Sequence, residues 1–166
     1  MNYRPACWLL LWTLVPARAV PQAPPSQPSL AIHGGFGNHY GWLGTAGEAY
    51  LLRGRLSAFA GIGIMPRELF SNFPTTLAGA GGLRYYVPLS DSRHRAFADL
   101  SVSLLEVSRA AMLGAPVSHD YGPGLSLGYS YVAGSGLTAT AGAGLGRAND
   151  GTVPVLHLGI GWTWRR

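Results

Sequence analysis

The sequence predicts an all-β protein, an eight-stranded antiparallel up-and-down transmembrane β-barrel. Three observations lead to this fold class. Apolar residues alternate with small residues at a period of two, the alternating segments are often about ten residues long, and short and long connections follow one another along the chain. Apolar residues do not recur at helical spacing over any long stretch after residue 28, and glycine is scattered through almost every segment.

The first 28 residues precede the patterned domain. Residues 1–4 form a short basic segment, and residues 8–15 form an apolar run. Ala17-Arg18-Ala19 has the small-x-small pattern of a cleavage site, so 1–19 is predicted to be a signal peptide. The apolar run is too short to span a bilayer as a helix, which takes roughly 20 residues. The proline-rich stretch 20–28 is expected to be a flexible leader, and 29–166 the barrel domain.

Eight segments have the pattern of strands. They are 29–37, 47–53, 55–65, 76–87, 95–107, 121–132, 136–146 and 152–164. Several approach or exceed the roughly 9 to 11 residues that a tilted strand needs to cross a bilayer, whereas strands of soluble sheets are usually about five or six residues long.

The alternation also indicates which face of each strand points outward. Two segments show it clearly: Leu56, Ala58, Ala60, Ile62 and Ile64 alternate with Ser57, Phe59, Gly61 and Gly63, while Leu125, Leu127, Tyr129 and Tyr131 alternate with Gly124, Ser126, Gly128 and Ser130. A soluble barrel would turn its small face to water, but that face carries almost no charge. We therefore expect the apolar face to contact lipid and the small and polar face to line a narrow lumen.

The connections fit the same orientation. Those following 47–53, 76–87 and 121–132 are mostly short, whereas those following 29–37, 55–65 and 95–107 are long. Short periplasmic turns and longer outside loops are typical of bacterial outer-membrane barrels. The connection "NDG" after 136–146 is a tight-hairpin signal and is the one outside loop that departs from this rule.

Composition excludes several functions. The single cysteine, Cys7, lies in the predicted signal peptide, so the mature chain is expected to have no disulfide, cysteine-based metal site or thiol nucleophile. The net charge is +5 and every basic residue is arginine, but no basic helix or aromatic-basic interleaving indicates nucleic-acid binding. No cofactor and no metal site is predicted.

The last strand has a terminal pattern of a polar residue, glycine and two aromatic residues: His157, Gly159, Trp162 and Trp164. In this pattern and in its predicted architecture the chain resembles the small eight-stranded outer-membrane barrels of the OmpA and OmpX type. The resemblance implies that the strand is an assembly signal read by the barrel-assembly machinery, with periplasmic chaperones as further partners during biogenesis. It also implies a monomer, with Trp162 and Trp164 in the periplasmic aromatic girdle among outer-membrane lipids. The tail Arg165-Arg166 departs from the family, which usually ends on the aromatic residue.

Ionisable residues at lumen-facing positions form the candidate site. These are His33, Glu48, Arg84, Asp99 and His157. Counting from the turn between 76–87 and 95–107 puts Arg84 and Asp99 at similar heights on paired strands, where they can form an ion pair. The set is interpreted as an internal charge network, since buried charges persist when paired; a proton relay, gate or small binding site is the functional alternative.

The interior is expected to be largely filled. Tyr50, Phe59, Tyr86 and Phe97 face the lumen, which in an eight-stranded barrel is only wide enough for side chains. An open pore is therefore not expected, although the lumen glycines leave room for water.

A local resemblance raises an enzymatic alternative. The stretch 143–151, "AGLGRANDG", is similar to the segment that follows the active site in outer-membrane lipid A 3-O-deacylases. That family carries His-x-Ser-Asn just before it, with an acid two residues after "NDG". Here Ala139, Ala141 and Gly142 stand at the first three matching positions and Val153 at the acid's, so deacylase activity is rejected.

The remaining polar and aromatic residues are assigned to the two ends. His39, His94 and His119 are expected to be solvated side chains of loops or turns. Six arginines, Arg53, Arg55, Arg93, Arg95, Arg165 and Arg166, are expected to be solvated anchors at the periplasmic end. The outer loops contain Tyr40, Trp42, Phe70, Phe73 and Met112, which allows a role in partner binding or adhesion.

The sequence thus predicts a non-enzymatic protein of the bacterial outer membrane with a structural or interaction role in the envelope. The alternative is a narrow, porin-like pore or a small-solute binding barrel that uses the lumen charges. Lipid A modification comes third. A soluble, lipocalin-like barrel with every strand face inverted is the outcome that would overturn the orientation.

Overall fold

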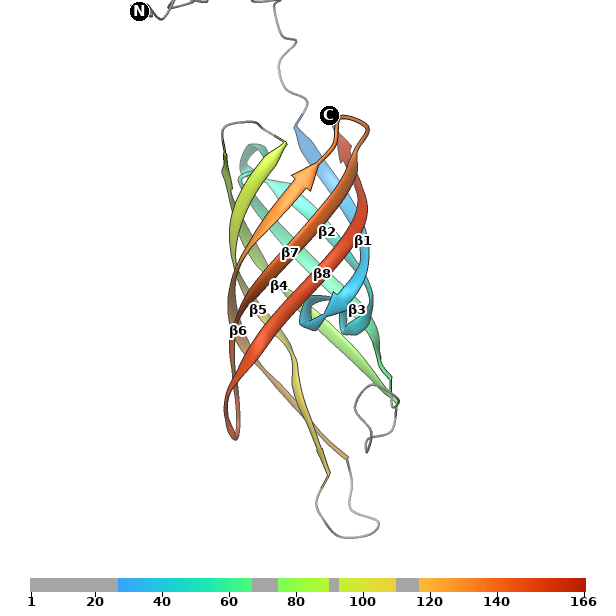
Figure 1. Cartoon of the computed structure of the whole chain (residues 1–166), viewed down its shortest axis with the longest axis vertical. Coiled ribbons are helices and arrows are strands. Elements are labelled where there is room, and N and C mark those ends of the chain that lie inside the picture. Colours follow the sequence, from blue (N-terminus) through green and yellow to red (C-terminus); the bar gives the residue numbers. More distant parts are fainter. Residues whose placement is uncertain (1–26, 67–74, 90–92, 110–116) are drawn as a thin grey trace, which may run out of the picture.

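The computed structural model is a closed barrel of eight antiparallel strands in sequence order, which confirms the predicted eight-stranded up-and-down β-barrel (Figure 1). It describes residues 27–66, 75–89, 93–109 and 117–166. The strands are β1 Pro28–Gly37, β2 Trp42–Leu51, β3 Leu56–Met65, β4 Thr76–Pro88, β5 His94–Arg109, β6 Val117–Val132, β7 Leu137–Ala148 and β8 Gly151–Arg165. The predicted signal peptide and most of the predicted leader lie outside the described residues.

Closure comes from the pairing of the first and last strands. Pro28 lies opposite Arg165 and Leu30 opposite Trp164, so the barrel has no free edge. Gln27 extends this pairing, because its backbone exchanges two hydrogen bonds of 2.8 Å with that of Arg166. The strand β1 thus begins at Pro28, one residue earlier than predicted, and both described termini lie at one end of the barrel, which we call the terminus end (Figure 1).

Two strands are longer than the others and extend the barrel at one end. The strands β5 and β6 have 16 residues each and form a hairpin that extends beyond the other strands at the end opposite the termini (Figure 1). A register shift between Leu104 and Glu106 interrupts their ladder where they leave the barrel.

The predicted faces are those of the structure. Large apolar side chains are exposed on the outside of every strand, including Ile62 on β3, Leu127 on β6 and Leu158 on β8. Among the described residues, every exposed Arg, Asp or Glu belongs to a connection, a strand end or the described C-terminus: Arg53, Arg55, Arg93, Arg147, Asp150 and Arg166. An apolar belt without exposed charge therefore surrounds the middle of the barrel.

One predicted connection was wrong. The long loop expected after the first strand does not exist, since β2 begins at Trp42 and only residues 38–41 separate it from β1. A 3-10 turn, η1 (Asn38–Tyr40), folds into the barrel, and all three of its residues are buried. Gly41 at φ 60° reverses the chain after it, a conformation that suits glycine.

A second short turn joins β2 to β3 at the terminus end. This turn, η2 (Leu52–Gly54), holds Arg53 at φ 58° and Gly54 at φ 78°, so its backbone is tightly curved. Its length agrees with the short connection predicted there.

Candidate functional site

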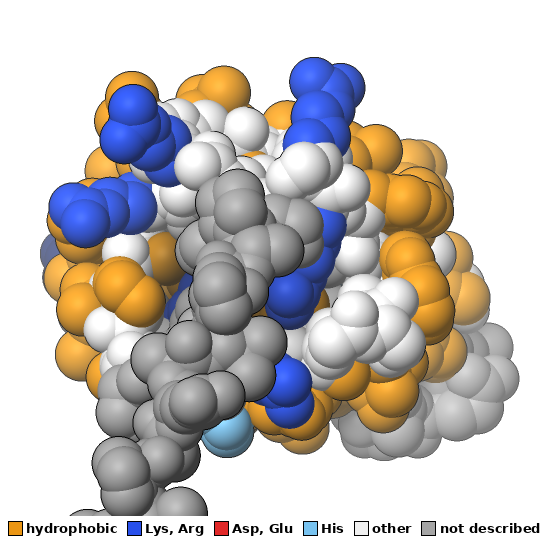
Figure 2. Space-filling model, turned by 90° about the horizontal axis from the view of Figure 1, so that it is seen from above, with side chains coloured by type: hydrophobic (Ala, Val, Ile, Leu, Met, Phe, Trp, Pro, Cys, Tyr) orange, Lys and Arg blue, Asp and Glu red, His pale blue; other side chains and the backbone are white. Residues whose placement is uncertain are grey.

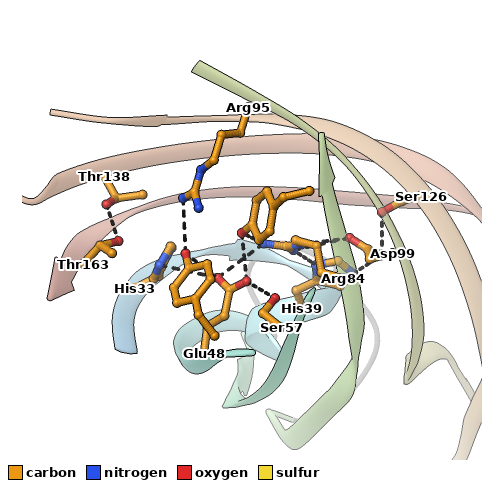
Figure 3. A network of polar contacts seen from close by, with 12 residues as sticks. His33, His39, Glu48, Ser57, Arg84, Arg95, Asp99, Ser126, Thr138 and Thr163 are labelled. Atoms are coloured by element: carbon orange, nitrogen blue, oxygen red, sulfur yellow. Dashed lines mark hydrogen bonds and ion pairs between the residues drawn. The ribbon is translucent and has the colours of Figure 1, made fainter. Parts of the chain in front are cut away.

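Arg84 lies at the centre of the polar interior. The antiparallel register puts it opposite Asp99 on β5, and its Nε donates a hydrogen bond of 3.3 Å to Asp99 Oδ2. Its other side faces Glu48 of β2, with Nη1 3.7 Å from Oε2. The guanidinium also lies 4.1 Å from the ring centroid of Phe97. One cation therefore bridges two carboxylates from opposite walls of the barrel (Figure 3).

Glu48 collects donors from several strands. It accepts hydrogen bonds from the hydroxyl of Ser57, from Tyr86 Oη at 2.8 Å and from Tyr50 Oη at 3.4 Å. His33 Nε2 lies 3.9 Å from its Oε2. Each donor offsets part of the cost of removing this carboxylate from water (Figure 3).

The inward turn η1, which we call the lumen plug, is held by Asn38. Its Nδ2 donates to the carbonyl of Leu104 at 3.1 Å, and its Oδ1 accepts from the backbone N–H of Leu156 at 3.1 Å. These two bonds tie the plug to β5, across the barrel, and to β8, the strand paired with β1. The plug is thus attached to both sides of the lumen.

His39 occupies the middle of the plug, and its predicted solvation was wrong. Its side chain is buried, with the residue 1% exposed. Arg84 Nη2 lies 3.0 Å from Nδ1; because a guanidinium has no acceptor, Nδ1 must accept and the ring proton sits on Nε2. Nε2 faces Asp99 Oδ1 at 3.4 Å. Its backbone neighbours at the turn carry no periodic pattern, so the sequence contained no signal for this position.

His157 completes the cluster by stacking. Its ring lies on that of His39 at 3.9 Å between centroids and 22° between planes, and neither of its nitrogens has a hydrogen-bond partner in the described part of the chain. It is therefore next to the charge network without being hydrogen-bonded to it.

Three residues of this cluster are of types that can bind a metal ion. Ligand atoms of His39, Asp99 and His157 lie within 4.8 Å of one another. Stacked rings present their faces to each other rather than converging lone pairs, and Arg84 already occupies His39 Nδ1. The contacts observed in this cluster are ring stacking and charge pairing.

Nucleophilic chemistry does not fit the cluster either. Ser126 Oγ donates to Asp99 Oδ1 at 2.8 Å, so serine and histidine share the carboxylate instead of forming a nucleophile–base pair. The positions that match the deacylase residues supply no nucleophile or base, because Ala139 and Ala141 are alanines exposed on the outside of β7.

The five predicted lumen residues are all buried and inward. The structure joins His33, Glu48, Arg84 and Asp99 through direct contacts, while His157 stacks on His39 and Phe97 beside the network. The aromatic residues predicted to fill the lumen, Tyr50, Phe59, Tyr86 and Phe97, are buried as well.

The residues of the terminal pattern divide between the two faces. His157 and Gly159 face the interior, whereas Trp162 and Trp164 are 42% and 45% exposed on the outside of β8. The two tryptophans lie near the terminus end, beside the first strand.

Several further assignments were wrong. His94 and His119, expected in loops or turns, lie in β5 and β6. Tyr40, expected in an outer loop, is buried in the lumen plug, and Trp42 belongs to β2, where it packs against the cluster of Met65, Ala78 and Leu104. Arg95, expected to be a solvated anchor, is buried inside the barrel. Phe70, Phe73 and Met112 lie outside the described residues.

The class that fold and interior define is an eight-stranded closed antiparallel barrel with a charge-paired, plugged lumen. No known family model, no curated protein and no solved structure matches the chain. In the described part of the chain, no helix has the length and apolar character required to span a membrane.

Proposed function

We propose that this chain is a bacterial outer-membrane β-barrel with a structural or interaction role in the envelope and without catalytic activity. The observation that carries the proposal is the apolar belt around the middle of the closed barrel. Exposed apolar patches of soluble monomers rarely exceed a few hundred Å², whereas a belt around the whole wall suits lipid contact. Within a bilayer, closure also satisfies every ladder hydrogen bond.

The filled lumen supports a structural role over conduction. At the level of the plug the interior leaves a cavity of about 10 Å³, lined by residues that include His33, His39 and Glu48. This is close to the smallest space that holds a single water, roughly 10 to 15 Å³. Ions would therefore need displacement of the plug to pass.

A narrow pore is the second candidate, and one observation favours it. The plug is a three-residue turn joined to the wall by the hydrogen bonds of Asn38 and by the contacts of His39 with Arg84 and Asp99, so its displacement would open the lumen. A pore predicts steady single-channel conductance for the unaltered protein, reduced or altered by Arg84→Ala. A structural barrel predicts no steady conductance for the unaltered protein.

The membrane proposal is tested with one charge placed at two heights on the outer wall. Leu158 is 60% exposed at the middle of the 15-residue strand β8, and Leu137 begins β7 near the terminus end. In a bilayer, Leu158→Arg is expected to cost about 2–4 kcal/mol and Leu137→Arg about 0–1 kcal/mol. On a soluble barrel, both substitutions would add a surface charge at little cost.

The measurement is membrane fractionation followed by gel mobility in detergent with and without boiling. Recovery in the outer-membrane fraction with a boiling-dependent shift, reduced in Leu158→Arg and retained in Leu137→Arg, is the expected result. Recovery of the unaltered protein as a soluble periplasmic species would overturn the proposal, as would equal tolerance of both substitutions.

A further inference from the structure

A pocket opens at the terminus end, apart from the charge network at the barrel centre. It has a volume of about 220 Å³, and its lining includes four arginines, Arg53, Arg55, Arg95 and Arg165, and no carboxylate. Seen from this end, several arginine side chains and no acidic side chain of the described residues are visible (Figure 2). We call this feature the end pocket.

Arg95 is the buried cation of the end pocket. The residue is 6% exposed, and its guanidinium lies 4.3 Å from the ring centroid of Tyr86 and donates a hydrogen bond of 3.4 Å to Tyr50 Oη. Its Nε has no hydrogen-bond partner, and no carboxylate of the described residues lies within 4.0 Å of its guanidinium. It reaches Glu48 only through the hydroxyl of Tyr50.

The charge of the buried Arg95 guanidinium is not fully compensated by the protein groups around it. Removing a guanidinium from water costs several kcal/mol unless an opposite charge and hydrogen bonds compensate it. The tyrosine rings supply part of this compensation through cation–π contact. The free Nε and the open pocket leave room for an anion to supply the rest.

The other arginines are held around the same space. Arg165 Nη2 donates to the carbonyl of Val132 at 3.1 Å, which fixes its side chain at the wall. Arg53, within the tightly curved turn η2, and Arg55, directly after it, are exposed at the mouth. Four cations from three separate parts of the chain thus converge on one cavity.

We propose that the end pocket binds a phosphate group. The planar fork of a guanidinium matches the oxygens of a phosphate, and several guanidiniums together suit its multiple charge. The volume equals that of about seven waters, which accommodates a phosphate with a small organic substituent but lies below the 300 to 1,000 Å³ of larger ligand sites. Pro28, Pro88 and Val132 supply an apolar wall for that substituent.

The phosphate can belong to a lipid headgroup or to a soluble phosphate ester, and both share the chemistry of the site. The proposal does not depend on membrane location, because it rests on the pocket and its charges alone. Its failure and that of the membrane proposal are therefore separate results.

The test is a titration of the folded full chain, in a neutral detergent, with inorganic phosphate, followed by ³¹P NMR. Saturable binding is expected, weakened about tenfold or more in Arg95→Gln, which is the factor for losing a charged hydrogen bond. The double substitution Arg53→Gln/Arg55→Gln alters two exposed side chains of the same pocket. Weaker phosphate binding in this variant therefore tests the proposal even if Arg95→Gln prevents folding. Arg147→Gln is the matched control, since this exposed arginine lies on β7 away from the end pocket.

Three results would overturn the proposal: no saturation by phosphate, equal weakening in Arg147→Gln, or binding of acetate as tight as that of phosphate. If saturable binding is found, micelles containing phosphatidylglycerol separate the two sources. Displacement of phosphate by phosphatidylglycerol but not by phosphatidylcholine supports a lipid headgroup, and absence of displacement supports a soluble phosphate ester.

Discussion

Arg84 and Arg95 are both buried arginines inside the same barrel, on the neighbouring strands β4 and β5, but their surroundings differ. Arg84 contacts two carboxylates directly, at 3.3 Å from Asp99 and 3.7 Å from Glu48. Arg95 contacts tyrosine rings and a tyrosine hydroxyl, and in the described part of the chain it pairs with no carboxylate. Figure 3 shows the two side chains in one view.

The difference shows that the position of a buried cation along the barrel axis determines how its charge is compensated. At the centre, walls from several strands and the lumen plug surround Arg84, so its charge is compensated within the protein. At the terminus end the interior meets a pocket, so Arg95 is left for a ligand. The following substitutions test this comparison.

The largest effect is expected for Arg84→Met. It leaves Glu48 and Asp99 as buried carboxylates without their shared cation, a change that costs about 3–5 kcal/mol. Urea unfolding of the folded protein, followed by tryptophan fluorescence, measures the loss. Adding Asp99→Asn to Arg84→Met should recover part of it; a loss below about 1 kcal/mol without any recovery would contradict the charge network.

The next effect is expected for Gly159→Ala. A Cβ at Gly159 would meet the hydroxyl of Tyr40, which is buried in the lumen plug, so the plug must shift. Overpacking of this kind costs about 1–3 kcal/mol. Gly47→Ala is the control, because a Cβ there meets nothing within 4 Å. Equal stability of the two variants would mean that Tyr40 does not fill the lumen at Gly159.

A smaller effect is expected for Thr163→Val. The hydroxyls of Thr138 and Thr163 lie 2.6 Å apart between β7 and β8, and Thr138 keeps a second bond of 3.0 Å to the carbonyl of Gly136. Loss of one uncharged hydrogen bond costs about 1 kcal/mol. A loss as large as that of Arg84→Met would show that uncharged interior pairs matter as much as the central ion pairs.

The smallest effect is expected for Arg95→Met without added ligand. The substitution removes cation–π contacts and a long hydrogen bond but also relieves an uncompensated buried charge. The two changes should offset each other to within about 1 kcal/mol in the same urea assay. Destabilisation close to that of Arg84→Met would remove the contrast between the two arginines.

Much of the fold could be predicted because it follows from the local alternation of apolar and small residues along each strand. The alternation in 56–64 and 125–131 carries over to the two faces of β3 and β6, and the bounds of seven strands lie within four residues of those predicted. Counting from a short turn placed Arg84 opposite Asp99, since antiparallel register follows directly from turn position.

The connection between β1 and β2 could not be predicted in this way. Asn38, His39 and Tyr40 have no periodicity, and three polar or aromatic residues after a glycine are typical of an exposed loop. Only the closed barrel provides partners for them: Leu104 and Leu156 bind Asn38 from strands far away in the sequence. Arg95 differs from the plug in this respect, because it shares the inward parity of Phe97 and Asp99 on β5, and the strand pattern alone therefore indicates its burial.

The sequence by itself determined the all-β class, the inward and outward faces and the strand residues that line the lumen, because side-chain direction in a strand depends only on parity. The tertiary structure alone decided which inward residues meet: it brought His39 of the lumen plug against Arg84 and Asp99 and left Arg95 beside an open pocket. Those contacts join residues up to 118 positions apart. They depend on barrel closure and on the path of one turn, which no local pattern encodes.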